Sequence, residues 1–348
     1  MSVKANQTEL AAALSRALKS AECGSPPLPE LASEWVKQAR SDAHLHGMAL
    51  DILGHAHQHL SAHRAAQDAF AAAIEQYQQA GSQQSATNTL ILLGTSLLLS
   101  EEPLRALEQW SNALELARET QNLAQCARVY LAIGQVYIGF GEDKVALEYN
   151  QKALKMAKLL ADDRLACETH LYVVNDYLRM KRYAQALAEL DCAEQLLTHP
   201  NKIWAAEIIY YRGAIHAQQG LFSQAKIELE TAYDLSFDND NLWGQVQALA
   251  TLGEVLLALH AENTVVILQQ ALSLAERIQL RSVVERCNRA LIQCYLDNQQ
   301  LEPALSLLAK TCQAHSPKVI HISTQHQQRI LELENRSSIL QLQRELVV

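Results

Sequence analysis

The first residues that could do chemistry are carboxylate and imidazole groups near the N-terminus. Asp51, His55 and His59 follow one another at four-residue steps within a histidine-rich stretch. That spacing places three side chains on one face of a helix, where two imidazoles can chelate a transition metal and the carboxylate can add a third ligand. The stretch lacks a His-Glu-x-x-His motif. We therefore predict a solvated polar face here and no metal site.

Motifs for covalent or nucleotide chemistry are missing from the sequence. It contains no Gly-x-Ser-x-Gly element, no Cys–His pair of a known signature and no glycine-rich phosphate-binding loop. The seven cysteines include no Cys-x-x-Cys pair, which favours reduced thiols in a cytoplasm. We predict that the chain is not an enzyme, binds no cofactor and is cytoplasmic.

The elements that must position any binding residues show a repeating pattern. Seven positions recur 40, 40, 40, 39, 40 and 39 residues apart, and we call them the glycine positions: Gly54, Gly94, Gly134, Val174, Gly213, Gly253 and Ile292. In most copies an alanine follows twelve residues later, and a bulky side chain such as Phe70 or Trp110 lies four residues beyond it. A fixed period of this size predicts a stacked repeat architecture.

Each period is predicted to form two helices joined by a short turn. Between Arg128 and Phe140 the apolar residues follow helical spacing, Gly-Glu-Asp interrupts them, and the pattern resumes from Val145 to Leu160. Small residues allow two helices to approach closely, and we expect Gly134 and Ala146 to form such a pair. A single hairpin cannot bury its apolar face alone, so neighbouring hairpins must stack.

These residues resemble the tetratricopeptide repeat, most clearly in the second period with Leu93, Gly94, Leu97, Ala106 and Trp110. The resemblance covers residues 43–314 and implies an all-α, right-handed superhelical solenoid of about seven hairpins. The closing proline of that repeat is absent, and the period is longer than the common one of about 34 residues.

The chain divides into three predicted regions. Residues 1–42 form a degenerate N-terminal cap, with helices at residues 7–20 and 30–40 separated by a proline-rich stretch. Residues 43–316 form seven repeats, and residues 317–348 form one long C-terminal helix. In that helix Ile339, Leu342 and Leu346 follow the spacing of a two-stranded coil seam, which predicts homodimerisation.

Residues facing the concave side of the solenoid can be located by counting from the glycine positions. Residues one after them are mostly polar, residues three before them form an apolar stripe in periods two to five, and residues six before them are mostly polar or charged. We call these the +1, −3 and −6 rows. Amides can satisfy a peptide backbone, an apolar stripe can hold side chains, and Arg can bind a carboxylate. The predicted peptide-binding residues are Arg128, Leu131, Gln135, Leu171, Asn175, Arg179 and Tyr210. The alternative is that the stripe packs against the neighbouring helix and the polar rows are merely solvated.

A second resemblance concerns the C-terminal segment. A repeat array followed by a helix ending in Leu-Gln-Arg-Glu-Leu is similar to the N-terminal sensory half of bacterial GGDEF-type diguanylate cyclases. It is limited to residues 330–348 and to the architecture, since the catalytic motif of that family is absent. The chain ends within the predicted helix, so we expect an output domain to follow in a longer protein.

Charge and hydropathy narrow the partners. The net charge of −9 comes without a basic block, and no apolar run approaches the roughly 18 residues needed to span a bilayer. We therefore predict no nucleic-acid or membrane partner. The leading hypothesis is a peptide- or protein-binding sensor module that controls an output domain. A free-standing scaffold is the alternative, and a peptide-pheromone receptor ranks third because no N-terminal helix-turn-helix is evident.

Overall fold

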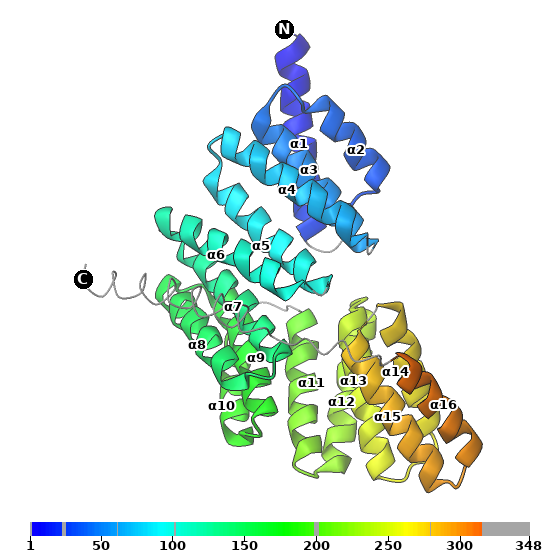
Figure 1. Cartoon of the computed structure of the whole chain (residues 1–348). Coiled ribbons are helices and arrows are strands. Elements are labelled where there is room, and N and C mark those ends of the chain that lie inside the picture. The colour runs from blue at the N-terminus through cyan, green and yellow to red at the C-terminus, as the bar shows by residue number, and fades with distance from the viewer. Residues whose placement is uncertain are drawn as a thin grey trace. The chain divides into compact units, whose positions relative to one another are not determined.

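The computed structural model describes residues 2–22, 26–60, 62–100, 102–197, 202–278 and 280–314. Within these ranges every regular element is an α-helix, and consecutive helices pack as neighbours (Figure 1). The predicted all-helical stack of hairpins is thereby confirmed. The predicted C-terminal helix, with Ile339, Leu342 and Leu346, lies outside the described residues.

Backbone contacts divide the chain into two compact units, which meet in the sequence between Leu160 and Ala161. The first unit contains eight helices within its described residues: α1 (Ser2–Glu22), α2 (Pro29–Gln38), α3 (Ala43–His59), α4 (His63–Gln79), α5 (Gln83–Leu99), α6 (Pro103–Glu119), α7 (Leu123–Gly139) and α8 (Asp143–Leu160). The second unit contains eight more: α9 (Asp163–Arg179), α10 (Tyr183–Gln195), α11 (Lys202–Gln218), α12 (Phe222–Asp238), α13 (Leu242–Ala258), α14 (Thr264–Arg277), α15 (Arg281–Asp297) and α16 (Leu301–Ala314).

The N-terminal helices differ slightly from the expectation. Helix α1 begins earlier and ends later than residues 7–20, and α2 ends at Gln38. Leu14 of α1 and Ala32 of α2 are fully buried in one cluster with Ile52 of α3. Both helices therefore cover the apolar face of the first hairpin, as a terminal repeat of a solenoid must.

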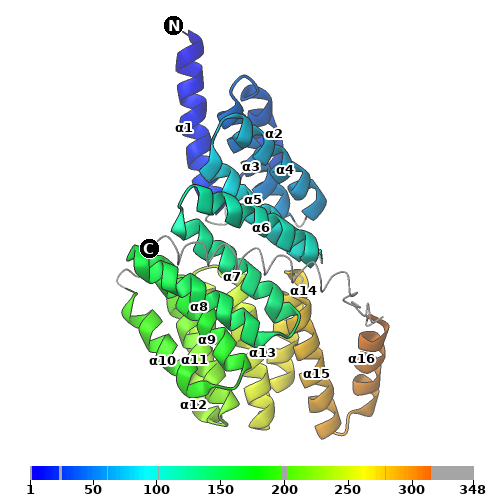
Figure 2. The same cartoon turned by 60° about the vertical axis from the view of Figure 1, so that its left-hand side comes forward.

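Within each unit the helices form two layers (Figure 2). Helices α9, α11, α13 and α15 contact one another in sequence, and α5 contacts α7 in the first unit. Among the described residues no even-numbered pair makes contacts of this extent. Odd-numbered helices are thus packed more closely than even-numbered ones, so they lie on the concave side of the bend in each unit.

Most connections are three-residue turns of one type. In the turn after α7, Gly141 has a positive φ of 77°, and the amide of Glu142 donates to the carbonyl of Tyr137 at 2.9 Å. This bond, from the second residue beyond the helix to a carbonyl in its last turn, satisfies one of the carbonyl groups that every helix end leaves unpaired. Asn122, Asp162 and Asn241 then cap the next helix by accepting a hydrogen bond from its backbone.

The closest helix approach occurs at the glycine positions, and it differs in detail from the expected one. A Cβ added to Gly134 would lie 2.6 Å from Oδ1 of Asn150, and one added to Gly94 would overlap the indole of Trp110. The side chain that meets each glycine is therefore the bulky residue sixteen positions later rather than the alanine at twelve. Phe70, Trp110 and Leu229 are almost completely buried at this position because the glycine leaves room for them.

We predict that Gly94→Ala destabilises the protein by about 2–4 kcal/mol, because the methyl group overlaps a buried indole that cannot move without opening the hairpin. Gly139→Ala is the matched control, since its added Cβ would meet nothing within 4 Å. The control should change stability by less than about 1 kcal/mol. Urea unfolding measures both, and an equal loss in the two variants would contradict the packing described here.

Candidate functional site

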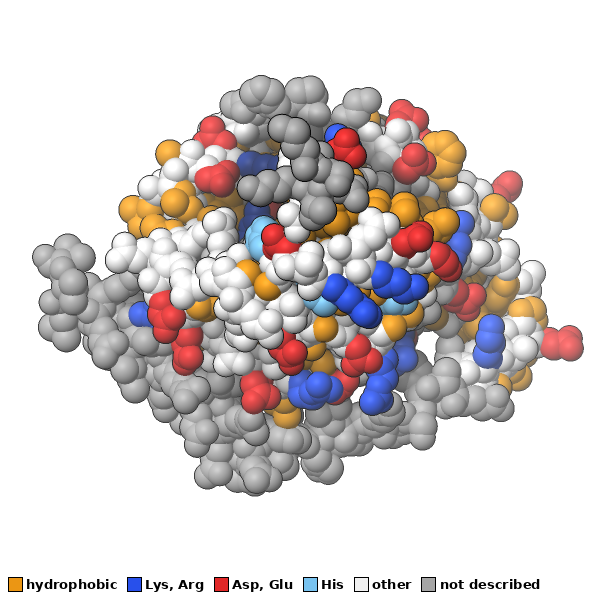
Figure 3. Space-filling model, turned by 90° about the horizontal axis from the view of Figure 1, so that it is seen from above, with side chains coloured by type: hydrophobic (Ala, Val, Ile, Leu, Met, Phe, Trp, Pro, Cys, Tyr) orange, Lys and Arg blue, Asp and Glu red, His pale blue; other side chains and the backbone are white. Residues whose placement is uncertain are grey.

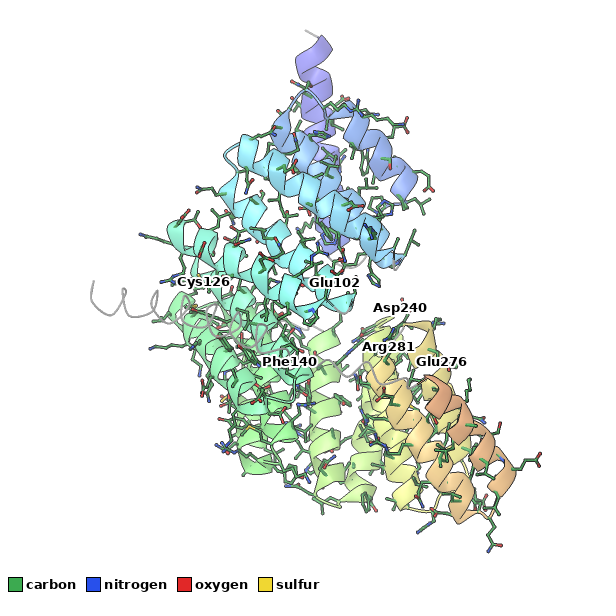
Figure 4. All side chains as sticks on the ribbon, viewed as in Figure 1. Glu102, Cys126, Phe140, Asp240, Glu276 and Arg281 are labelled. Carbon is green, nitrogen blue, oxygen red and sulfur yellow. The ribbon has the colours of Figure 1, made fainter. Side chains whose placement is uncertain are left out.

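The candidate site is the concave face made by the odd-numbered helices. Its +1 row stays partly or fully exposed at six of seven positions, Ala214 being the buried exception. Its −6 row is at least partly exposed everywhere except Met48. Two polar rows therefore reach solvent along this face within each unit. Figure 4 labels Asp240 and Arg281, which mark the edge of the second unit where α13 and α15 begin.

Between these rows lies the −3 row, which is largely buried. Leu131, Leu171 and Tyr210 retain 4, 3 and 9% of their surface. Their side chains pack between neighbouring helices, as the alternative interpretation of the stripe expected. Little of their surface is left for a ligand, so binding on this face must depend mainly on the polar rows.

The predicted peptide-binding residues fall on three helices. Arg128 and Gln135 lie on α7 in the first unit, with the arginine exposed and the amide partly buried. Asn175 and Arg179 lie on α9 in the second unit, again one partly buried and one exposed. Within the second unit α9 contacts α11, which carries Tyr210.

Polar side chains link neighbouring odd helices in the first unit. The Gln125 amide of α7 donates to Oδ1 of Asn88 at 2.9 Å and to the carbonyl of Gln84 at 2.8 Å, both on α5. Buried Asp51 of α3 accepts a hydrogen bond from Thr89 of α5 at 3.0 Å. These bonds fix the spacing of adjacent helices and so the spacing of the rows.

The face with Asp51, His55 and His59 serves packing. Asp51 also accepts a bond from Tyr77 at 3.4 Å, and the imidazole of His55 packs edge-on against Phe70 with ring centroids 5.7 Å apart. Burial lowers the pKa of His55. Among the described residues no three His, Cys, Asp or Glu side chains form a group that could hold a metal ion.

The second unit carries two coupled carboxylates in its −6 row, Glu168 on α9 and Glu207 on α11. Burial and the charge of Glu168 together raise the pKa of Glu207 to about 7. Burial and the same two carboxylates raise the pKa of Tyr172, and burial and Glu207 raise that of Tyr211. This part of the face is therefore strongly negative whenever both carboxylates are ionised, and each one raises the cost of ionising the other.

Further along the same face the charges are compensated. Arg286 of α15 donates to both oxygens of Glu254 on α13, at 3.0 and 2.8 Å, and to Oγ1 of Thr251 at 3.0 Å. Burial alone would lower the pKa of Arg286, but the hydrogen bonds and charge of Glu254 raise it. Trp243, at the start of α13, stays 38% exposed and packs edge-on against Tyr210. The second unit thus combines an acidic region, an exposed aromatic ring and a closed ion pair.

Sequence reasoning placed these side chains in the right rows but did not select them. Glu168, Glu207 and Arg286 all belong to the −6 row, and Glu254 belongs to the +1 row. Like charges at equivalent positions of adjacent repeats, and opposite charges in adjacent rows, were the available signal. Trp243 lies outside all three rows, so counting could not find it.

Comparison with known proteins fits this architecture. Residues 85–158, which lie in α5 to α8, match the family described as tetratricopeptide repeat. The apo form of RapI is similar over 82% of this chain and 79% of its own, with a TM-score of 0.59 and 15% identity. The fold is a tetratricopeptide-repeat solenoid.

Two further tetratricopeptide-type structures are similar over almost the whole chain. A Rap protein complexed with Competence and Sporulation Factor has a TM-score of 0.57 and 15% identity, covering 97% of this chain and 99% of its own. NprR in complex with its cognate peptide NprX has a TM-score of 0.58 and 12% identity, covering 97 and 100%. No curated protein sequence matches the chain. At such identities the likeness establishes the fold alone.

Two surface properties bear on partners. None of the helices in the described ranges is long and apolar enough to cross a membrane. On the face shown in Figure 3, basic and acidic side chains lie intermixed with hydrophobic ones.

We predict that Glu207 makes stability pH-dependent. Because its folded pKa of about 7 exceeds its ordinary value of 4.5, the folded state holds a proton that the unfolded state has released between these values. Stability should therefore fall as the pH rises through this window. Glu207→Gln should remove that fall and stabilise the protein at pH 8 by about 2 kcal/mol.

The matched control is Glu276→Gln, which changes an exposed carboxylate near the end of α14 (Figure 4). Urea unfolding at pH 5 and pH 8 compares the two variants with the parent chain. Parallel pH dependence in Glu207→Gln and the parent would show that Glu207 is ordinarily ionised.

Proposed function

We propose that this chain is a regulatory binding module whose concave face, in the second unit, binds a short peptide or an extended protein segment. One observation carries the proposal: two polar rows reach solvent on either side of a buried apolar row, along the tightly packed layer of helices. Side chains held on helices keep a fixed spacing, and a fixed spacing suits an extended backbone whose donors and acceptors also recur regularly. The proposed activity is binding rather than catalysis.

The electrostatics of the second unit favour a ligand with a basic group. An incoming Lys, Arg or amino terminus would relieve the repulsion between Glu168 and Glu207 and lower the pKa of Glu207. Charge-assisted hydrogen bonds of this kind contribute more than neutral ones. Arg286 is already occupied by Glu254, so a ligand carboxylate would have to compete with an existing bidentate pair.

The solved structures give this proposal further support. The NprR structure contains its cognate peptide, and a Rap conjugation gene regulator, similar with a TM-score of 0.56, is in complex with the Phr* peptide. These complexes make the peptide-receptor hypothesis, ranked third from the sequence, stronger than the scaffold hypothesis. We also keep Arg128 and Gln135 of α7, and Asn175 and Arg179 of α9, as proposed contacts within their own units.

The proposed output of the module rests on the C-terminal segment. We propose that Ile339, Leu342 and Leu346 pair with a second copy, and that ligand binding alters this pairing in a cytoplasmic protein. Control of a diguanylate cyclase is carried only by the resemblance of residues 330–348. A scaffold without an output domain is the competing function. The intact mass of the native gene product separates them, since a product larger by a whole domain favours the sensor and one of this length favours the scaffold.

The binding proposal predicts selective enrichment from a pool of random hexapeptides with free termini. The immobilised full chain should enrich peptides bearing Lys or Arg, because only these supply a cation to Glu168 and Glu207. Glu168→Gln with Glu207→Gln should weaken the best peptide by about 10-fold or more, the equivalent of one charge-assisted hydrogen bond. Peptide sequencing and fluorescence anisotropy provide the two measurements.

The matched control is Glu230→Gln with Asp234→Asn, which removes two exposed carboxylates one turn apart on α12, in the even layer. Its affinity should stay within about twofold of the parent, since surface charges away from a site act only weakly. Equal losses in both double variants would mean that general surface charge attracts the peptides. Enrichment without basic residues would refute the acidic site.

A further inference from the structure

A groove on the opposite layer of the first unit has no role in the proposed peptide site. It has a volume of about 430 Å³ and lies between α4 and α6, with α5 beneath it. Both even helices pack on α5, so the gap between them is floored by an odd helix. The groove falls within the size range of small-ligand pockets.

The groove is apolar at its base and polar at its rim. Ile74 of α4 and Leu90 and Leu93 of α5 line it, each 6–8% exposed. Gln78 on one wall and Gln109 on the other contribute amide groups. A side chain entering the groove would therefore meet hydrocarbon first along its length and hydrogen-bonding groups at its end.

Its rim is also negatively charged. Glu115 and Glu119 are exposed and lie one turn apart on α6, and none of the residues lining the groove is Lys, Arg or His. Carboxylates four residues apart on a helix repel each other. A cation placed between them would remove that repulsion and gain attraction from both.

We propose that this groove docks a basic segment of a partner protein through two Lys or Arg side chains one helical turn apart. Such side chains have a hydrocarbon stem and a charged head, so the stem matches the apolar base and the head matches the rim. Their spacing matches that of Glu115 and Glu119, and the amides of the walls supply further acceptors. The groove is thus a second interaction surface, on the even layer, independent of the concave peptide site.

The test uses the full chain and a fluorescent, alanine-rich helical peptide of about 16 residues, long enough to hold helical structure, with two Arg four positions apart. A second peptide carries Gln at the same two positions. We expect the Arg peptide to bind at least 10-fold more tightly in fluorescence anisotropy. Glu115→Gln with Glu119→Gln should weaken the Arg peptide at least 10-fold, and so should Ala71→Trp, which fills the groove from its exposed α4 wall.

Glu230→Gln with Asp234→Asn on α12 is again the control, because it removes two exposed acids at the same spacing. It should leave binding within twofold of the parent. Equal weakening by both acid-to-amide pairs, unchanged binding in Ala71→Trp, or equal binding of the Arg and Gln peptides would each overturn the proposal. Hexapeptide selection by the concave face should be unaffected by the groove variants, so the two proposals fail separately.

Discussion

The structure depends on one steric constraint, the approach of a bulky side chain to the backbone of a glycine in the preceding helix. Phe70, Trp110, Leu229 and Leu268 each lie where a Cβ on their partner glycine would collide with them. The hairpin is held by dispersion contacts made over this short distance, and interior packing tolerates little change in volume. Because the constraint recurs at nearly constant spacing, every odd helix is presented at an equivalent rotation. The polar rows exist as rows for that reason.

Function on the concave face comes at a cost in stability. Glu168 and Glu207 occupy equivalent positions on adjacent helices, and burial with mutual repulsion raises the pKa of Glu207 to about 7. An apolar pair at these positions would pack without that penalty. Perturbed carboxylates in a concavity are common at binding and catalytic sites, where a ligand supplies the missing charge. By contrast, Arg286 and Glu254 satisfy each other and stabilise the far end of the same unit.

Much of the fold could be predicted from the sequence because the repeat signal is local and is read seven times. The hairpins, their turns and the membership of each row follow from counting. The burial of Leu131 and Tyr210 could not be derived that way, because it depends on how closely two odd helices approach. The contact of Gly134 with Asn150 was also missed, since that period carries a polar residue where the others have a bulky apolar one. The coupling of Glu168 to Glu207 needs a tertiary distance, which no single repeat contains.

The most direct test of the account is fluorine NMR of the full chain labelled with 5-fluorotryptophan, titrated with the hexapeptide that the concave face selects. Trp243 lies on an odd helix and is 38% exposed, whereas Trp110 is buried in the hairpin core. The account predicts that the Trp243 resonance, assigned with Trp243→Phe, shifts on binding while that of Trp110 does not. A shift confined to Trp35 of α2, or no shift of Trp243 at saturation, would contradict peptide binding on the concave face.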